Sequence, residues 1–408
     1  MKISVLTIGD ELLTGATINT NAASLGESLV GCGCSPAMAM TVADRAEDIA
    51  RALDFLLPQS QIIICSGGLG STGDDVTCQS VADYFGLPLV EDAETAAKLR
   101  RRLESGHVRC APEKLLRQAM IPAGAEALLN SHGTAPGIWL KLPDADKYLC
   151  LLPGPPHEQR PMVAGELLPR LTGIMGDKSC SRVYRIAFAS ELWVEEITAG
   201  ILRDTPAVSP AYCAAADHVR LFLRSNDEVA LLKKATEIEM AFGARIIRPE
   251  CHSLAEEMVA LLRERHLQLA TAESCTGGMI AAAITDIPGS SAIFRGSVIA
   301  YSDAIKHDVL GVSSTVLEAY GSVSGQCVSS MVENLCVKLH AEAGVAVSGI
   351  AGPGGGTVAK PVGLVFVAAK LGQKAVVKQY NFPGNRDAVR RSTVAAALFE
   401  LRCLMLDV

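Results

Sequence analysis

The pattern of apolar and polar positions divides this chain into three successive blocks of predicted strands and helices. In the first block, apolar runs that indicate buried strands alternate with a helical segment and with glycine-rich loops. Strands are expected at 3–8, 61–65 and 148–152, and a helix at 19–30 whose cap is Thr20 or Asn21. This alternation predicts an α/β domain with a parallel sheet, which we place at residues 1–176.

The two following blocks differ from each other in character. Residues 177–250 predict a small α+β domain, with strands at 182–188 and 218–224 and helices at 191–202 and 228–242. Residues 251–408 predict another α/β domain with a largely parallel sheet. Its helices are expected at 253–264, from Cys275 onward, at 325–339 and at 386–406 with Asn385 as cap, and its strands at 267–272, 297–301, 345–348, 362–369 and 374–382.

Composition fits this division and limits the choice of partner. A chain of 408 residues is too long for one ordinary core, and its 49% hydrophobic and 20% charged residues are typical of globular protein. The net charge of -7 provides no basic surface for nucleic acid or for an anionic membrane. A small nucleotide, held by backbone amides and a few cations, is therefore the expected partner.

The cysteines and the start of the chain indicate a reducing compartment. The 13 cysteines are an odd number without a C-x-x-C pair, and Cys32 and Cys34 are the closest two. No secretory segment and no apolar run of 18 residues is found, so a cytoplasmic location is expected.

Three polar residues in the last block suggest a hydrolase. Ser274 lies between a predicted strand and a predicted helix, in the sequence Thr-Ala-Glu-Ser-Cys-Thr-Gly-Gly that ends at Gly278. A serine nucleophile needs a base and donors for an oxyanion. Lys306, if desolvated, would be the base, and Tyr301 would relay the proton or orient it.

Each of these assignments has an alternative. Ser274 or Thr276 would equally serve as a helix cap, and the Cys275 thiolate would be the intrinsically better nucleophile. The glycine-rich loop after Ser348 favours the site hypothesis, because its amides can hold a phosphate or an amide oxygen. Arg386 or Arg390 would bind a substrate phosphate, or would simply lie on a solvated helix face.

The segments around these residues closely resemble the nicotinamide-nucleotide amidohydrolase domain of the CinA family, over about residues 253–402. The resemblance implies deamidation of nicotinamide mononucleotide to nicotinic acid mononucleotide and ammonia, without a cofactor. It assigns catalysis to Ser274, Tyr301 and Lys306, and a substrate-binding hydroxyl to Ser348. From the residue types themselves we also expect substrate binding by Thr276, Gly277, Gly278, Gly349, Gly352, Arg386 and Arg390. Ser348 stands where the family usually has threonine, which keeps the hydroxyl oxygen.

A second constellation follows the strands of the first block. Acids, including Asp10, lie after the first strand, and the loop 66–77 combines amides, hydroxyls, Asp74 and Asp75. Amides suit a phosphate, and carboxylates beside it suit a hard divalent cation. Asp10 alone would more often be a helix cap.

These stretches resemble the molybdopterin-binding-type domain that opens CinA proteins, over about residues 1–176. The resemblance implies a pyrophosphatase that splits ADP-ribose into AMP and ribose 5-phosphate with a divalent metal. Asp75 would be catalytic, Asp74 and Asp75 would hold the metal, and Asp10, Asn21, Gly67, Gly68, Gly70, Thr72, Gly154 and Glu158 would bind substrate. Ser71 replaces a usual proline.

The middle block occupies the place of a KH-like linking domain in long CinA proteins, but it has no Gly-x-x-Gly clamp and no basic stripe. We therefore interpret it as a spacer or a dimerisation module, and the family resemblance suggests a homodimer. Two other functions stay open for the whole chain. The first is a molybdenum-cofactor enzyme or binding protein. The second is a non-catalytic competence or DNA-damage partner protein.

Overall fold

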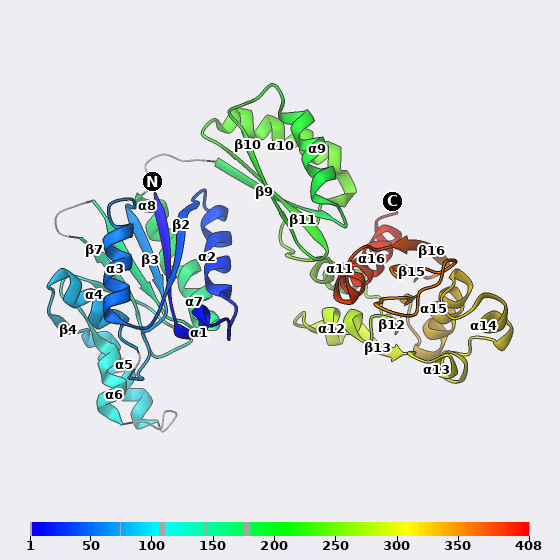
Figure 1. The fold of residues 1–408 in the computed structure, drawn as a ribbon, viewed down its shortest axis with the longest axis horizontal. Helices are drawn as coiled ribbons and strands as arrows, with labels where there is room; N and C mark the ends of the chain where they lie inside the picture. The colour runs from blue at the N-terminus through cyan, green and yellow to red at the C-terminus, as the bar shows by residue number, and fades with distance from the viewer. Residues whose placement is uncertain (1, 74, 106–110, 143–145, 175–179, 408) are drawn as a thin grey trace. The chain divides into compact units, whose positions relative to one another are not determined.

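The computed structural model describes residues 2–73, 75–105, 111–142, 146–174 and 180–407. The chain divides into two compact units, Met1–Ser181 and Arg182–Val408 (Figure 1). The predicted middle domain and the predicted C-terminal domain thus fall within one unit, although each has a sheet of its own. Within the described residues, no helix combines the length and the apolar composition that crossing a bilayer requires.

A six-stranded sheet forms the centre of the N-terminal unit. Its strands lie in the order β2 (Pro36–Val42), β1 (Ile3–Ile8), β3 (Ile62–Ser66), β8 (Tyr148–Leu152), β7 (Gly137–Lys141) and β6 (Glu126–Leu128). The first four strands are parallel to one another, whereas β7 is antiparallel to β8, and β6 is antiparallel to β7. Strands β1 and β3 are buried along their whole length, as their apolar sequences predict.

Helices cover both faces of this sheet. Alternate residues of β3 point to opposite faces, so Ile63 packs with Leu53 of α3 (Ala46–Leu56), and Ile64 packs with Leu25 of α2 (Thr20–Gly31). The remaining elements are α1 (Asp10–Leu13), α4 (Thr77–Phe85), β4 (Leu89–Glu91), α5 (Ala93–Glu104), α6 (Pro112–Leu116), a 3-10 turn (Arg117–Ala119), β5 (Met120–Pro122), α7 (Pro156–Met162), a π turn (Val163–Leu167) and α8 (Leu168–Ile174).

The C-terminal unit begins with a three-stranded sheet. Its strands lie in the order β10 (Ser209–Ala214), β11 (His218–Ser225) and β9 (Cys180–Ala187), and α9 (Glu191–Leu202) and α10 (Glu228–Phe242) accompany them. A 3-10 turn (Gly243–Arg245) leads to the second sheet. Arg402 joins the two parts, since its buried guanidinium pairs with Glu257 at 2.5 Å and donates to the Ile246 carbonyl at 2.9 Å.

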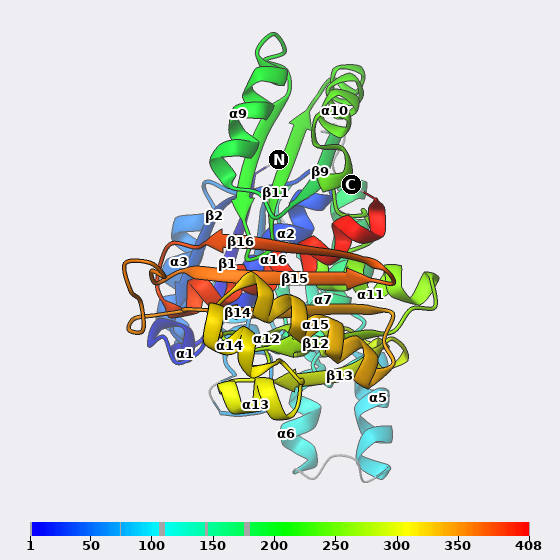
Figure 2. The ribbon, with the colours of Figure 1, turned by 90° about the vertical axis from the view of Figure 1, so that its right-hand side faces the viewer.

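The five-stranded sheet of this unit runs in the order β13 (Phe294–Ile299), β12 (Leu269–Glu273), β14 (Ala343–Gly349), β15 (Leu364–Leu371) and β16 (Lys374–Asn381), which can be followed in Figure 2. The first three strands are parallel, and β15 and β16 are antiparallel additions.

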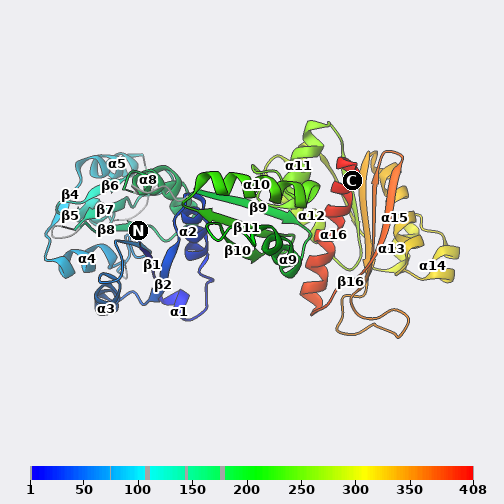
Figure 3. The same ribbon diagram turned by 90° about the horizontal axis from the view of Figure 1, so that it is seen from above.

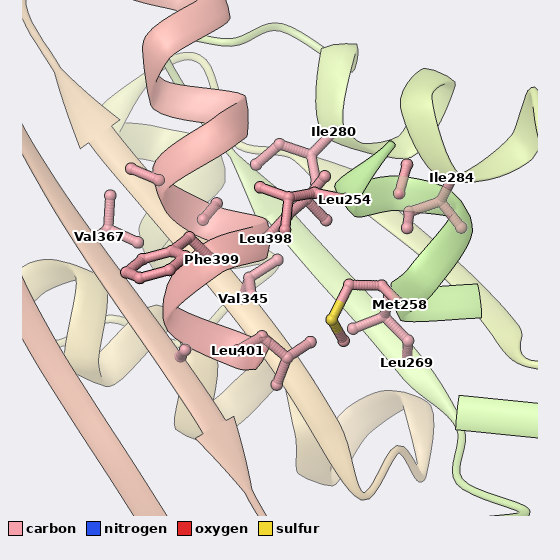
Figure 4. Close-up of a cluster of buried hydrophobic side chains, with 14 of the residues drawn as sticks. Leu254, Met258, Leu269, Ile280, Ile284, Val345, Val367, Leu398, Phe399 and Leu401 are labelled. Atoms are coloured by element: carbon pink, nitrogen blue, oxygen red, sulfur yellow. The ribbon is translucent and has the colours of Figure 1, made fainter. Parts of the chain in front are cut away.

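Helices α16 (Arg386–Leu406) and α15 (Gly325–Leu339) lie on opposite sides of the five-stranded sheet (Figure 3). On the α16 side, the main core joins Leu398 and Leu401 to α11 (Leu254–Glu264), α12 (Met279–Thr285) and the inward residues of β12, β14 and β15 (Figure 4). On the other side α15 covers small residues such as Ala270 and Ala346. The remaining elements are a 3-10 turn (Ser290–Ala292), α13 (Asp303–Asp308) and α14 (Ser314–Tyr320).

Most predicted elements are found within a few residues, and three expectations are corrected. The α2 cap is Asn19, whose side chain accepts the Ala22 amide at 3.0 Å, and neither Thr20 nor Asn21. Helix α12 begins at Met279 and not at Cys275, because a turn intervenes. Strand β13 ends at Ile299, which leaves Tyr301 in the following loop.

Candidate functional site

Ser274, Tyr301 and Lys306, the three residues predicted to be catalytic in the C-terminal domain, line one cavity of about 200 Å³. Ser274 follows β12, Tyr301 follows β13 and Ser348 lies near the end of β14. Because these strands are parallel neighbours, their carboxyl ends share one edge of the sheet. The lining also includes Lys306 of α13 and Cys275, Asp303, Ser322, Val323, Gly349, Ala351 and Arg386.

A buried carboxylate, which the sequence analysis missed, shapes the turn that carries Ser274. Glu273 has no exposed surface, and its oxygens accept the amides of Gly278 at 3.0 Å, Ile280 at 3.0 Å and Ala281 at 2.8 Å. It thus takes the free amides at the start of α12, where the N-cap residue Gly278 contributes no side-chain bond. Its signal in the sequence was an acid at a strand end, five to eight residues before those amides.

The alternative that Ser274 caps the helix is therefore wrong, because Glu273 has that role. Gly277 and Gly278 have φ of +59° and +96°, a backbone region that residues other than glycine rarely adopt. They let the chain turn directly after the serine. Ser274 is 8% exposed and lines the cavity, whereas Thr276 is fully buried below it.

The Lys306 side chain is only 2% exposed and also lines the cavity. Its amine donates to the Asp303 carboxylate at 3.4 Å, a partner that the sequence analysis did not single out. The Ser302 hydroxyl caps α13 by accepting the Ile305 amide at 3.4 Å, which fixes the helix that carries the lysine.

The two candidate arginines have different positions. Arg386 lines the cavity and donates to the Tyr301 hydroxyl at 3.0 Å and to the Gly352 carbonyl at 2.9 Å. Arg390 instead donates to the carbonyls of Cys275 at 3.2 Å and Thr276 at 2.7 Å, so it braces the turn from below. Of the two, Arg386 lines the cavity and Arg390 does not.

The competing nucleophile is electrostatically disfavoured. Burial raises the pKa of the Cys275 thiol to about 11, and the nearby Glu273 carboxylate adds to this effect. At neutral pH this thiol stays protonated and is a weak nucleophile. Ser348 is 1% exposed and donates to the Ser322 carbonyl at 2.7 Å, so its hydroxyl is held at the cavity wall.

The N-terminal site is a second cavity, of about 440 Å³, at the carboxyl ends of β1, β3 and β8. Its lining includes the predicted residues Asn21, Gly67, Gly68, Gly70, Asp75, Gly154 and Glu158. Asp10 is exposed and does not belong to that lining, while Glu11 and Asp44 do. Asp74 lies outside the described residues.

Two positions in the loop after β3 require glycine, because neighbouring atoms lie too close for a Cβ atom. A side chain at Gly67 would meet the Ile8 carbonyl oxygen at 2.1 Å, and one at Gly68 would meet the Thr77 hydroxyl at 2.1 Å. Both residues also have positive φ, of +114° and +65°. The loop therefore presents its backbone, not side chains, to the cavity.

Asp75 organises this loop. Its carboxylate accepts the Gly70 amide at 2.7 Å, the Thr72 amide at 2.9 Å and the Thr72 hydroxyl. On the opposite wall, the Asn21 amide group donates to the Ser66 hydroxyl at 3.0 Å and to the Gly154 carbonyl at 2.6 Å. The Asn21 Oδ1 atom is buried without a partner, which leaves an acceptor free at the cavity.

A divalent cation fits these residues only with help from a substrate. Among the described residues, no group of three His, Cys, Asp or Glu side chains is arranged to hold a metal. Mg²⁺ is commonly bound by one or two carboxylates together with water and substrate phosphates. Asp75 can supply such a carboxylate if it retains its bonds to the loop.

Comparison with known proteins gives matches in both units. The model of the CinA C-terminal domain matches residues 251–405, and that of a probable molybdopterin binding domain matches residues 4–173. The chain is 37% identical to a "Putative competence-damage inducible protein" of Moorella thermoacetica, over 98% of both chains. It is also 37% identical to a "CinA-like protein" of Akkermansia muciniphila, over 98% of this chain and 96% of the relative.

Solved structures also include proteins similar to part of this chain. The crystal structure of competence/damage inducible protein CihA from Agrobacterium tumefaciens is 39% identical, covers 37% of this chain and 93% of that chain, and has a TM-score of 0.37.

Proposed function

Because this chain belongs to the CinA family, we propose that its C-terminal domain deamidates nicotinamide mononucleotide to nicotinic acid mononucleotide and ammonia. The observation that carries this proposal is the single cavity lined by Ser274, Tyr301 and Lys306. An alcohol, a phenol and a buried amine around one space supply the nucleophile and the proton carriers that amide hydrolysis needs.

In the proposed reaction, the Ser274 oxygen attacks the carboxamide carbon while its hydroxyl proton passes to the Lys306 amine. The amide of Cys275, which directly follows the nucleophile and lines the cavity, would meet the oxyanion. Lys306 then gives its proton to the leaving nitrogen, ammonia departs, and a nicotinoyl ester remains on the serine. Lys306 then takes a proton from water, and the resulting hydroxide attacks the ester carbon. The bond between that carbon and the Ser274 oxygen breaks, nicotinic acid mononucleotide leaves, and Lys306 returns the proton to the serine oxygen.

Two further contacts support the substrate assignment. Arg386 reaches the cavity and carries a positive charge suited to the mononucleotide phosphate. Its bond to the Tyr301 hydroxyl holds a side chain that is otherwise 62% exposed. Tyr301 would then orient Lys306 or relay its proton, and pack against the pyridine ring.

The test is ammonia release from nicotinamide mononucleotide by the purified full-length protein. Ser274→Ala should lower kcat by about a thousandfold or more, as loss of a serine nucleophile does in other hydrolases. Cys275→Ala is the matched control, because it removes the adjacent thiol and should retain the parental rate within about threefold. Parental activity in Ser274→Ala would refute the nucleophile.

We further propose that the N-terminal domain cleaves ADP-ribose to AMP and ribose 5-phosphate with a divalent cation. Support comes from the 440 Å³ cavity, its backbone-lined loop and Asp75 at its edge. A bound cation would neutralise charge on the diphosphate. The chain itself would hold the diphosphate by the loop amide at Gly68, since the Gly67 amide donates to the Leu152 carbonyl at 3.1 Å, and would orient the ribose hydroxyls through Asn21 Oδ1.

The match to a probable molybdopterin binding domain favours one rival, a pterin-phosphate or molybdenum-cofactor protein. Incubation with ADP-ribose and Mg²⁺, Mn²⁺ or Co²⁺, followed by chromatography for AMP, separates the two. AMP that disappears with Asp75→Asn supports the pyrophosphatase, and no AMP with any cation favours the rival. A purely non-catalytic competence role is contradicted if either activity is present.

A further inference from the structure

A third cavity, of about 450 Å³, adjoins the N-terminal site and is not used by the proposed reaction. Thr134 lines both cavities. The two are also linked by hydrogen bonds, since the Lys98 amine donates to the Asn130 carbonyl and the Asn130 side chain donates to Glu158 at 2.7 Å. The two cavities are therefore neighbours that share a wall at Thr134.

The third cavity has a strongly cationic end. Lys98, Arg101, Arg102 and Ser105 line it from α5 and its C-cap, at the spacing of three and four residues that places them on one helix face. Leu99 of the same helix faces the opposite way, into a small core with Leu115. Packing of Leu99 against Leu115 on one face of α5 thus directs the opposite face, which carries Lys98, Arg101 and Arg102, at the cavity.

Among the described residues, none of Lys98, Arg101 and Arg102 forms a salt bridge, although the Glu94 carboxylate also lines the cavity. Partial burial and the positive charge of Arg102 lower the pKa of Lys98, and the Glu158 carboxylate acts in the opposite direction. Asp92, at the other end of the cavity, is occupied as the α5 cap and accepts the Thr95 amide at 2.8 Å. Like charges held together in a partly desolvated space favour an anion between them.

The other wall suits the rest of a nucleoside. Leu129 is 61% exposed and lines the cavity with Ala127 and Pro136, which gives an apolar surface next to the cationic end. The hydroxyl of Thr134 adds polar contact at the junction of the two cavities. A base or ribose on the apolar surface would bring a phosphate on that ribose to Arg101 and Arg102.

We infer that this cavity binds a phosphate monoester on the ribose of an adenosine nucleotide whose 5′ phosphate lies in the N-terminal site. The inference rests on the proposed function and narrows its substrate class to ADP-ribose derivatives that carry a further phosphate on the adenosine ribose. Two arginines and a lysine match the charge and the oxygens of such a group.

The test compares binding of AMP with binding of adenosine 2′,5′-bisphosphate and 3′,5′-bisphosphate to the full-length protein by calorimetry. One of the bisphosphates should bind about tenfold or more tightly than AMP, because its extra phosphate gains charge-assisted bonds. The double variant Arg101→Gln/Arg102→Gln should reduce this advantage to about twofold or less while AMP binding stays unchanged.

Arg100→Gln is the matched control, since Arg100 lies on the same helix but pairs with Glu91 at 3.0 Å and does not belong to the cavity lining. It should keep the full preference for the bisphosphate. Equal binding of AMP and both bisphosphates, or a preference that survives the double variant, would overturn the inference.

Hydrolysis assays separate this result from the proposed activity. If the preference for a bisphosphate depends on Arg101 and Arg102 but ADP-ribose is never cleaved, the subsite stands and the pyrophosphatase proposal fails. If ADP-ribose is cleaved and the bisphosphates gain nothing over AMP, the pyrophosphatase stands and the subsite is wrong.

Discussion

The substitution Glu273→Gln tests whether a buried carboxylate holds in place the turn that carries Ser274, the proposed nucleophile. Glu273 is fully buried, and three backbone amides donate to its two oxygens, two of them to Oε2. A glutamine of the same shape can keep the pair at Oε2. The glutamine Nε2 then takes the place of Oε1 and faces the amide of Ala281. Both groups are donors, so the hydrogen bond that the Ala281 amide makes to Oε1 is lost.

The expected cost follows from these contacts. A hydrogen bond to a charged group contributes about 1.5–3 kcal/mol, and an unsatisfied buried donor costs about 1–3 kcal/mol. With one bond lost and the other two weakened, the start of α12 should lose about 2–4 kcal/mol of local stability. Hydrogen exchange of the amides of Gly278, Ile280 and Ala281 should speed up by about 30-fold to several hundredfold.

Exchange measured by NMR or mass spectrometry, together with kcat for deamidation, is the assay. We expect kcat to fall by at least about tenfold, because a small displacement of a nucleophile is costly. Glu264→Gln is the control, since that carboxylate only forms an exposed pair with Arg248 and should change neither quantity by more than about twofold.

Retained ADP-ribose cleavage would report that the N-terminal unit is intact. Unchanged protection of the three amides in Glu273→Gln would refute the reasoning, even if activity fell. Faster exchange with full activity would show that the turn is held by the carboxylate but that its stability does not limit catalysis.

Three further predictions rest on other contacts. Arg402→Met should lower the free energy of unfolding of the C-terminal unit by about 3–5 kcal/mol, because the Glu257 carboxylate stays buried without its charged partner. Adding Glu257→Leu should recover most of this loss, as measured by thermal melts. No recovery in the double variant would contradict the role of the pair. A hydrogen bond from Cys34 lowers the pKa of the Cys32 thiol to about 7. The rate of Cys32 alkylation, followed by peptide mass spectrometry, should therefore increase as pH rises through about 7 and then level off. The midpoint of this pH profile should be higher in Cys34→Ala. Arg390→Gln removes two bonds to carbonyls of the nucleophile turn and should reduce kcat for deamidation about tenfold with little change in KM; a change in KM alone would instead indicate a substrate contact.

Local pattern was enough to predict elements whose ends are marked by strong signals. The unbroken apolar run of β1 and the helix α16, with Asn385 as its cap, were predicted with the observed bounds. At α2 the choice between neighbouring cap candidates was wrong. Several polar residues follow one another there, and only the backbone conformation decides which side chain reaches the free amides.

The start of α12 shows the limit of such reasoning. Ser274 and Thr276 are both acceptable caps by residue type, yet Glu273 takes the amides from inside the fold. A buried carboxylate is costly unless donors meet it, and the sequence does not show which donors will do so. Asp10 is the opposite case, since an acid at a strand end was expected in the cavity and instead lies exposed beside it.

The sequence by itself determined the long buried strands such as β1, β3 and β8, the helices with strong caps, the family motifs and the residue types that amide hydrolysis requires, whereas elements such as β2, β7 and α3 were not predicted. Only the tertiary structure brought Ser274, Tyr301 and Lys306 to one cavity and separated the role of Arg386 from that of Arg390. The physical reason is that the order of strands in a sheet sets which loops meet at its edge. That order depends on long-range packing of whole helices and strands and not on any local pattern.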